Sequence, residues 1–373
     1  MIHDQKAPSV GVVIPTGGRR PALLRAATAA VLAQAYPGPI DVVIVTDGAA
    51  PEAAPEVVAE QVADVVAAAT AARLLDGAGG WLDAARSSPG AGGPRPWGVA
   101  PQEFGGSGRW FGVAGAGPDA ARGPGHGPGG PRVVRVLGNR LSPGLPGARN
   151  TGIAALDTEL VAFCDDDDEW LPGKLAAQVA ALGDRPGAEF ASCGIEVEYL
   201  GRRTARVAGR DTVTARDLAR SRMVMVHSST FLFRRGGLWA DESAPNGQNE
   251  DWDLALRAAK RQPIVNVDRP LVRVRWGGSE YATRWGDRIA GLEWMLARHA
   301  DLAVDPRGAA RIYGQLAFLH AATGRRREAV RWAGRAFASW AGEPRAPIAL
   351  AVAAGLVPAS AVLGLLHTWG HGI

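Results

Sequence analysis

The stretch LVAFCDDDDEW, residues 160–170, joins an apolar run directly to four consecutive aspartates. The apolar run predicts a buried strand, and the aspartates follow at its carboxyl end. Four adjacent carboxylates repel one another, so a hard divalent cation with oxygen ligands would stabilise them. A solvated acidic turn or a helix N-terminus is the alternative interpretation. The stretch favours a ligand site at the edge of a sheet.

Strand and helix patterns alternate on both sides of this stretch. Strands are predicted at 10–14, 40–46, 133–137, 159–164, 189–199 and 229–233, and helices at 20–35, 51–75, 147–156, 172–182 and 249–260. This alternation predicts an α/β fold with a Rossmann-type, mainly parallel sheet flanked by helices. Ligands of such sheets bind beyond the carboxyl ends of the strands, where Thr16 and Asp47 fall.

Two regions depart from the α/β pattern. Residues 76–131 are dominated by Gly, Pro, Ala and Ser, which predicts a disordered surface insertion. The alternative is a mobile lid that carries four aromatic residues: Trp97, Phe104, Trp110 and Phe111. Helical patterns follow residue 284, including a helix pair at 314–323 and 325–340. We expect one domain over 1–276 and a helical C-terminal region over 277–373.

The segment 346–366 is uncharged and interrupted by Pro358, and a group of arginines precedes it. A membrane span, interfacial docking and a soluble helical hairpin are all compatible with this pattern. Peripheral membrane contact through the C-terminal helices is therefore one expectation.

Composition sets further limits on compartment and partners. The 373 residues carry a formal charge of +4, which is too small to indicate nucleic-acid binding. The two cysteines, Cys164 and Cys193, make no disulfide framework or zinc motif. The first residues contain no apolar segment typical of a secretory signal. We expect a cytoplasmic protein, with any membrane association at the inner face.

Five segments in order resemble the inverting glycosyltransferases of family 2. They are VGVVIPT (10–16), VIVTDGA (43–49), PGARNTGIAAL (146–156), VAFCDDDDEWLPGKL (161–175) and NEDWDLALR (249–257). The resemblance covers residues 9–75 and 132–276. It implies a GT-A-like fold and transfer of a sugar from a nucleotide-sugar to an acceptor hydroxyl.

By this resemblance, the aspartates form a DXD motif that binds Mn²⁺ or Mg²⁺. Asp167 corresponds to the main metal ligand, and Asp168 assists it. Asp165 corresponds to a contact with the sugar-nucleotide, and Asp166 occupies the variable position of that binding segment. The cation would bridge the diphosphate of the donor.

The nucleotide pocket is placed by the same resemblance at Pro15, Thr16, Asp47, Arg149 and Asn150. The resemblance implies that Asp47 accepts a hydrogen bond from uracil or ribose, which favours a UDP-sugar. We also expect the Arg149 guanidinium to offset diphosphate charge through a forked pair of hydrogen bonds.

The Glu250-Asp251 pair corresponds to the acidic pair on the acceptor side, which makes Asp251 the expected catalytic base. Taken without the resemblance, helix capping is the favoured explanation of the pair. Glu250, His227 and Trp252 are candidate acceptor or phosphate contacts. A structural role is the alternative for His227 and Trp252.

Two other functions remain open at this point. A nucleotidyltransferase also joins such a sheet to a carboxylate-bound metal, and a scaffold with a degenerate transferase domain is the non-enzymatic alternative. The acceptor class is open as well: a glycan, a lipid-linked molecule, a peptide or a small molecule.

Overall fold

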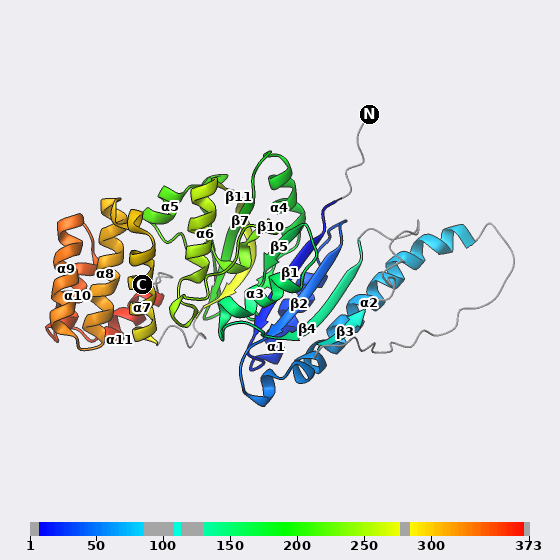
Figure 1. Cartoon of the computed structure of the whole chain (residues 1–373), viewed down its shortest axis with the longest axis horizontal. Helices are drawn as coiled ribbons and strands as arrows, with labels where there is room; N and C mark the ends of the chain where they lie inside the picture. The colour runs from blue at the N-terminus through cyan, green and yellow to red at the C-terminus, as the bar shows by residue number, and fades with distance from the viewer. Residues whose placement is uncertain (1–6, 86–107, 113–129, 277–283, 369–373) are drawn as a thin grey trace.

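The computed structural model describes residues 7–85, 108–112, 130–276 and 284–368 (Figure 1). Its strands are β1 (Val10–Thr16), β2 (Ile40–Thr46), β3 (Gly108–Gly112), β4 (Arg132–Gly138), β5 (Leu160–Phe163), β6 (Glu169–Trp170), β7 (Phe190–Tyr199), β8 (Arg202–Arg206), β9 (Thr212–Val213), β10 (Leu232–Arg234) and β11 (Ile264–Arg275). Its α-helices are α1 (Pro21–Leu32), α2 (Pro55–Ala85), α3 (Leu145–Ala155), α4 (Lys174–Gly183), α5 (Ala215–Arg220), α6 (Glu250–Arg261), α7 (Trp285–Arg298), α8 (Pro306–Ala322), α9 (Arg326–Ser339), α10 (Arg345–Ala353) and α11 (Ala359–Thr368).

The described strands form a single mixed sheet. Its main order is β3-β4-β2-β1-β5-β10-β7-β11-β6, with β8 paired to β7 and β9 to β11. The strands β4, β2, β1 and β5 are mutually parallel, as are β7 and β11. The antiparallel strand β10 lies between these two groups. The predicted α/β class with a mainly parallel sheet is confirmed.

Helix α3 packs very closely on β1, and a glycine makes this approach possible. A Cβ atom placed on Gly152 would lie 2.3 Å from Cγ1 of Val13, so a larger side chain would collide with the strand. Ile153 and Val13 belong to the same buried cluster. This packing positions Arg149, one turn earlier on α3, at the carboxyl edge of the sheet.

The C-terminal helices α7–α11 form the end of the molecule opposite α2 (Figure 1). One hydrophobic cluster contains residues from both regions, such as Phe231 and Trp252 beside Leu316 and Trp332. The predicted helix pair is present as the second half of α8 followed by α9, with Gly324 at a φ of 76° between them. The division at residues 276/277 stays a prediction.

Two segments differ from what their composition suggests. The predicted disordered insertion, 76–131, contains the end of α2 and the strand β3, which pairs with β4. Trp97 and Phe104 lie outside the described residues. The apolar segment 346–366 is divided into α10 and α11, with Gly355 at a φ of 78° and Pro358 between them. None of the described helices has the length and apolarity required to cross a bilayer.

Candidate functional site

The four aspartates lie in the loop between β5 and β6, at the carboxyl edge of the sheet. Phe163 at the end of β5 pairs with Val13 of β1, so the loop begins beside the end of β1. Thr16 Oγ1 at the end of β1 donates a hydrogen bond of 2.6 Å to Asp166 Oδ2. The structure therefore brings together two segments that the sequence separates by 150 residues.

Each aspartate of the loop has its own partners. Asp165 accepts hydrogen bonds from Arg149 Nη2 at 2.6 Å and from Ser228 Oγ at 2.7 Å. Asp166 accepts a further hydrogen bond from Arg20 Nη2 at 2.6 Å, and Asp167 forms an ion pair with the same arginine.

Asp168 is turned toward a different neighbour. It accepts a hydrogen bond of 2.6 Å from Ser229 Oγ and lies 3.5 Å from Nδ1 of His227. Arg20 and the two serines were not among the sequence candidates. Nothing in the sequence indicated that Arg20 faces the aspartates or that hydroxyl donors lie at 228 and 229.

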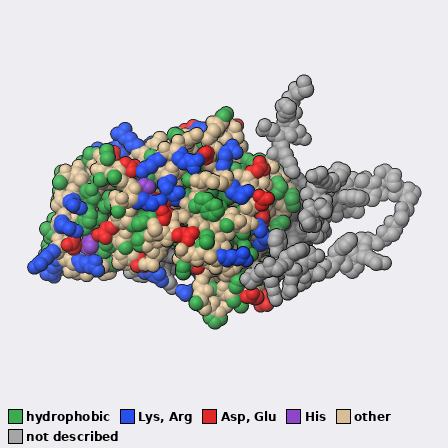
Figure 2. Space-filling view, in the orientation of Figure 1, with side chains coloured by type: hydrophobic (Ala, Val, Ile, Leu, Met, Phe, Trp, Pro, Cys, Tyr) green, Lys and Arg blue, Asp and Glu red, His purple; other side chains and the backbone are tan. Residues whose placement is uncertain are grey.

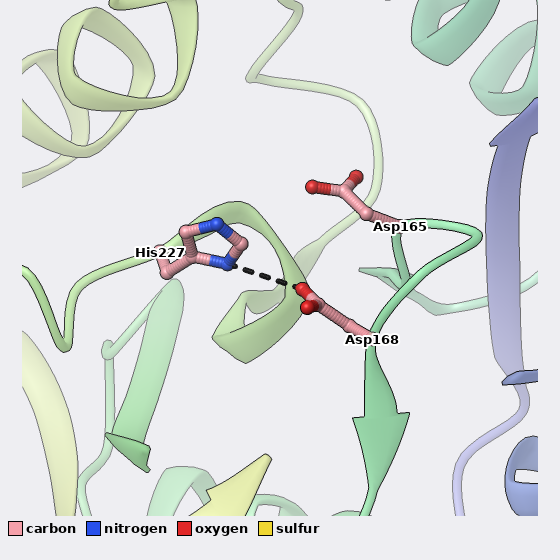
Figure 3. A group of neighbouring side chains, drawn as sticks. All are labelled: Asp165, Asp168 and His227. Carbon is pink, nitrogen blue, oxygen red and sulfur yellow. Dashed lines mark ion pairs between the residues drawn. The ribbon is translucent and has the colours of Figure 1, made fainter. Parts of the chain in front are cut away.

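Asp165, Asp168 and His227 form a group that could hold a metal ion. One ligand atom from each residue lies within 4.8 Å of the other two. Figure 3 shows that Asp165 and Asp168 come from one loop, while His227 approaches Asp168 from a separate segment. Two carboxylates and an imidazole are suitable ligands for a divalent transition metal such as Mn²⁺. The predicted ligand Asp168 belongs to this group, whereas Asp167 is paired with Arg20.

Burial and neighbouring charges disfavour the ionised form of two carboxyl groups in the loop. Burial raises the pKa of Asp168 to about 7; the charges of Asp165 and Asp167 raise it as well, and His227 opposes them. Burial also raises the pKa of Asp166 to about 6, against the effects of Thr16 and Arg20. A bound dication would stabilise the ionised carboxylates and relieve this repulsion. The donor set and its charge therefore fit a divalent metal.

A pocket opens at the ends of the neighbouring strands β2 and β4. It has a volume of about 400 Å³, and its lining includes Thr46, Asp47 and Asn139. Asp47 accepts hydrogen bonds from Asn139 Nδ2 at 2.7 Å and from the backbone N–H of Gly144 at 2.8 Å. The candidate nucleotide residues Pro15 and Thr16 are buried at the end of the neighbouring strand β1.

Arg149 connects the aspartate loop to helix α6. Its side chain is only 1% exposed; Nη2 donates to Asp165, and Nη1 forms an ion pair with Glu250. From the sequence we expected the Arg149 guanidinium to face a diphosphate. In the structure, both of its terminal nitrogens are paired with carboxylates of the protein. Asn150 is also engaged by protein: its side chain exchanges hydrogen bonds with the backbone of Ala240.

The candidate base Asp251 lies in the first turn of α6, next to a cation. Arg222 Nη2 is 3.0 and 2.9 Å from its two carboxylate oxygens. Burial acts to raise the pKa of Asp251, but Arg222 and then His227 outweigh it and hold the pKa below its usual value. Arg222 was not a sequence candidate, because nothing along the chain indicates that it faces Asp251.

Trp252 takes a structural position in this helix. It is fully buried, and its indole N–H donates to the backbone carbonyl of Leu218 at 3.2 Å. Its ring therefore packs in the core, where it does not face an acceptor. The neighbouring Glu250 is likewise buried, at 3% exposure.

Comparison with known families identifies the enzyme class. The model of the family described as "Glycosyl transferase family 2" matches residues 127–240. The matched segment includes Arg149, the four aspartates and His227. The chain thus carries a family 2 glycosyltransferase segment, and the protein is a glycosyltransferase. Among curated proteins, no match is found.

Solved structures support the GT-A fold. S. aureus TarS 1–349 in complex with UDP-GlcNAc has a TM-score of 0.51 at 12% identity, covering 97% of this chain and 92% of that one. The mannosyltransferase PcManGT from Pyrobaculum calidifontis, in complex with GDP-Man and Mn²⁺, has a TM-score of 0.43 at 16% identity, covering 98% and 83%. The likeness to TarS concerns the fold.

Proposed function

We propose that this glycosyltransferase moves a sugar from a nucleotide-sugar, preferably a UDP-sugar, to an acceptor hydroxyl with inversion at the anomeric carbon. The observation that carries the proposal is the convergence of three elements at one sheet edge. They are the pocket at Asp47, the aspartate loop and the first turn of α6 with Asp251. Arg149 joins the last two directly.

The donor nucleotide would occupy the pocket beside Asp47. Thr16 and Asp47 end adjacent parallel strands, as expected for ligand contacts in such a sheet. The TarS structure contains UDP-GlcNAc, and this makes a UDP-sugar the first donor to test. Pro15, Arg149 and Asn150 would shape the site without direct contact to the nucleotide, since each is buried or engaged by protein groups.

Asp165, Asp168 and His227 would hold the divalent metal, Mn²⁺ or Mg²⁺, in the arrangement described above. When bound, the metal would supply positive charge against the diphosphate of the leaving nucleotide. Asp167, the ligand expected from the family motif, would join this set only after leaving Arg20. Asp166 would keep the loop against β1 through Thr16.

Asp251 would accept the proton of the acceptor hydroxyl as that oxygen attacks the anomeric carbon. Its lowered pKa keeps it ionised at neutral pH, which is the state that accepts a proton. Arg222 would orient the carboxylate, and Glu250 would fix the helix turn through Arg149.

The test is a screen of nucleotide-sugars with the purified full chain, with and without Mn²⁺. Metal-dependent release of a nucleoside diphosphate is expected, and Asp251→Asn should slow it by roughly 10²–10⁴-fold. A matched control is Asp241→Asn, an aspartate that hydrogen-bonds Ser243 away from the loop. Release of pyrophosphate instead would identify a nucleotidyltransferase, and no binding of any donor with metal present would support a scaffold.

The remaining predictions concern organisation and place in the cell. We propose that residues 1–276 form the transferase domain and 277–373 a helical appendage in a cytoplasmic protein. A membrane contact through the C-terminal helices would involve the exposed Arg327, Arg331 and Phe337 of α9 and the exposed Leu356 and Val357 between α10 and α11. Figure 2 shows Lys and Arg side chains among hydrophobic ones at this end of the molecule.

A further inference from the structure

Arg311 of α8 has a partly buried guanidinium that forms no ion pair within the described part of the chain. Its Nε and Nη2 atoms are inaccessible to solvent and have no hydrogen-bond partner in the described chain. The hydrogen bond that Arg311 does form joins Nη1 to Gln315 Oε1, a neutral group, at 3.4 Å. Because a buried ion without a counter-charge is costly, this guanidinium needs an explanation.

Two more arginines surround this position. Burial lowers the pKa of Arg311 to about 9, and the positive charges of Arg345 and Arg222 lower it further, against Glu343. The group therefore stays protonated at neutral pH. Glu343 is paired with Arg345 at 2.8 Å, and Asp251 is paired with Arg222 at 2.9 Å. Three cations thus share two carboxylates, and Arg311 is left in excess.

The cluster lies next to the proposed base. The guanidinium carbons of Arg222 and Arg311 are 5.7 and 5.2 Å from the centre of the Trp252 ring, and Trp252 directly follows Asp251. The side chains of Arg222 and Arg345 are 29% and 30% exposed, so two members of the cluster are in contact with solvent. An anion held there would be one arginine side chain away from the base.

We propose that Arg222, Arg311 and Arg345 form a binding site for a phosphate group carried by the acceptor. The acceptor is then a hydroxyl compound that is also a phosphate ester. A guanidinium fork matches the geometry of phosphate oxygens, and several guanidinium groups around one anion neutralise its charge. This inference rests on the proposed function, in which Asp251 receives the acceptor's proton.

The test measures binding of inorganic phosphate to the full chain by equilibrium dialysis in the presence of EDTA. Without a metal ion, the four aspartates repel phosphate from the donor edge. Saturable binding is expected, and Arg311→Met should weaken it by at least about tenfold, as the loss of a charge-assisted contact would. Arg307→Met is the matched control, because Arg307 is an exposed arginine one turn earlier on α8. It should change the affinity less than about twofold.

A second variant keeps the test decisive if Arg311→Met does not fold. Arg345→Gln alters a partly exposed side chain and should weaken phosphate binding by roughly three- to tenfold. Wild-type affinity in a folded Arg311→Met protein would overturn the proposal. If that variant is unfolded, wild-type affinity in Arg345→Gln would do so.

Competition separates the sources of the phosphate. Glycerol 1-phosphate as a monoester and glycerophosphoglycerol as a diester should each be compared with glycerol. Displacement by either ester assigns the site to that class, and equal displacement by glycerol contradicts a phosphate site. UDP binding with Mn²⁺, measured on the same samples, should survive Arg311→Met. Its absence from the wild-type chain would contradict the proposed function, whereas phosphate binding that ignores Arg311 would contradict this inference alone.

Discussion

Arg222 holds Asp251 through a single nitrogen, Nη2, which lies 3.0 and 2.9 Å from the two carboxylate oxygens. The aspartate is otherwise in a buried setting that acts to raise its pKa. The ionisation of the proposed base at neutral pH therefore depends first on Arg222, and His227 and Arg149 add to its effect.

Replacing Arg222 with glutamine should move the acid limb of the pH–rate profile to higher pH. Without the guanidinium, burial raises the pKa of Asp251, so a higher pH is needed to ionise the base. Metal-dependent donor hydrolysis measured across pH checks this. Arg220→Gln, on the same segment, should leave the limb unchanged, and an unshifted limb in Arg222→Gln would remove Asp251 from the role of base.

Asp168→Asn and Asp167→Asn should affect metal binding unequally. Asp168 lies in the group with Asp165 and His227, whereas Asp167 is paired with Arg20. Loss of an outer partner of a metal site costs roughly 10–100-fold in affinity, and loss of a ligand should cost at least as much. Titration with Mn²⁺ by electron paramagnetic resonance should show the larger loss for Asp168→Asn. The opposite order would support Asp167 as the main ligand.

Removing Arg149 should destabilise the protein strongly. Arg149→Met leaves Glu250 buried without its cation, and breaking such a pair costs about 3–5 kcal/mol. The double variant Arg149→Met/Glu250→Leu should recover part of this loss, because it also removes the stranded carboxylate. Thermal unfolding of the single and double variants provides the comparison. A double variant that is less stable than Arg149→Met would contradict the bridging role.

Asp253 should make stability depend on pH in the acid range. It is fully buried and accepts hydrogen bonds from His299, Arg257 and Arg298. Burial acts to raise its pKa, but these three partners together hold it below the ordinary value of 3.8. Its contribution is therefore complete above that value and is lost as the pH falls through the lower pKa of the folded state.

Asp253→Asn should accordingly lower the free energy of unfolding by about 2 kcal/mol at neutral pH, since the arginine partners are partly exposed. The difference in the free energy of unfolding between Asp253→Asn and wild type should become smaller as the pH falls below 3.8, the ordinary pKa of an aspartate. Melting temperatures at a series of pH values test this. A difference that stays constant into strong acid would assign the effect to packing rather than charge.

The sequence predicted most of the sheet, because buried strands leave apolar runs with clear ends. The predicted strand at 40–46 coincides with β2, and the predicted helices at 147–156 and 249–260 differ from α3 and α6 by one or two residues. The predicted strand at 229–233 begins instead as a 3-10 turn, Ser228–Thr230. That turn directs the hydroxyl groups of Ser228 and Ser229 at Asp165 and Asp168. The spacing of apolar residues along the sequence does not reveal such contacts.

The partners of charged groups were beyond what the sequence could predict. Arg149 meets Glu250, about a hundred positions later, and Arg20 meets Asp166 and Asp167. Such contacts depend on which strands become neighbours and on the exact rotation of a helix. The role expected for Arg149 came from its place in a motif, whereas its surroundings are set by tertiary packing.

The hydrophobic cluster shared by the sheet and the C-terminal helices has a consequence for engineering and evolution. Trp252 directly follows the proposed base. The hydrophobic cluster that contains Trp252 also contains Leu316 of α8 and Trp332 of α9. Recombining the catalytic sheet with a foreign C-terminal region would therefore create mismatched apolar surfaces directly behind Asp251. We expect residues on the two sides of this hydrophobic interface to change together during evolution. Chimaeras joined near residue 276 should therefore need several compensating substitutions at the interface before they become soluble.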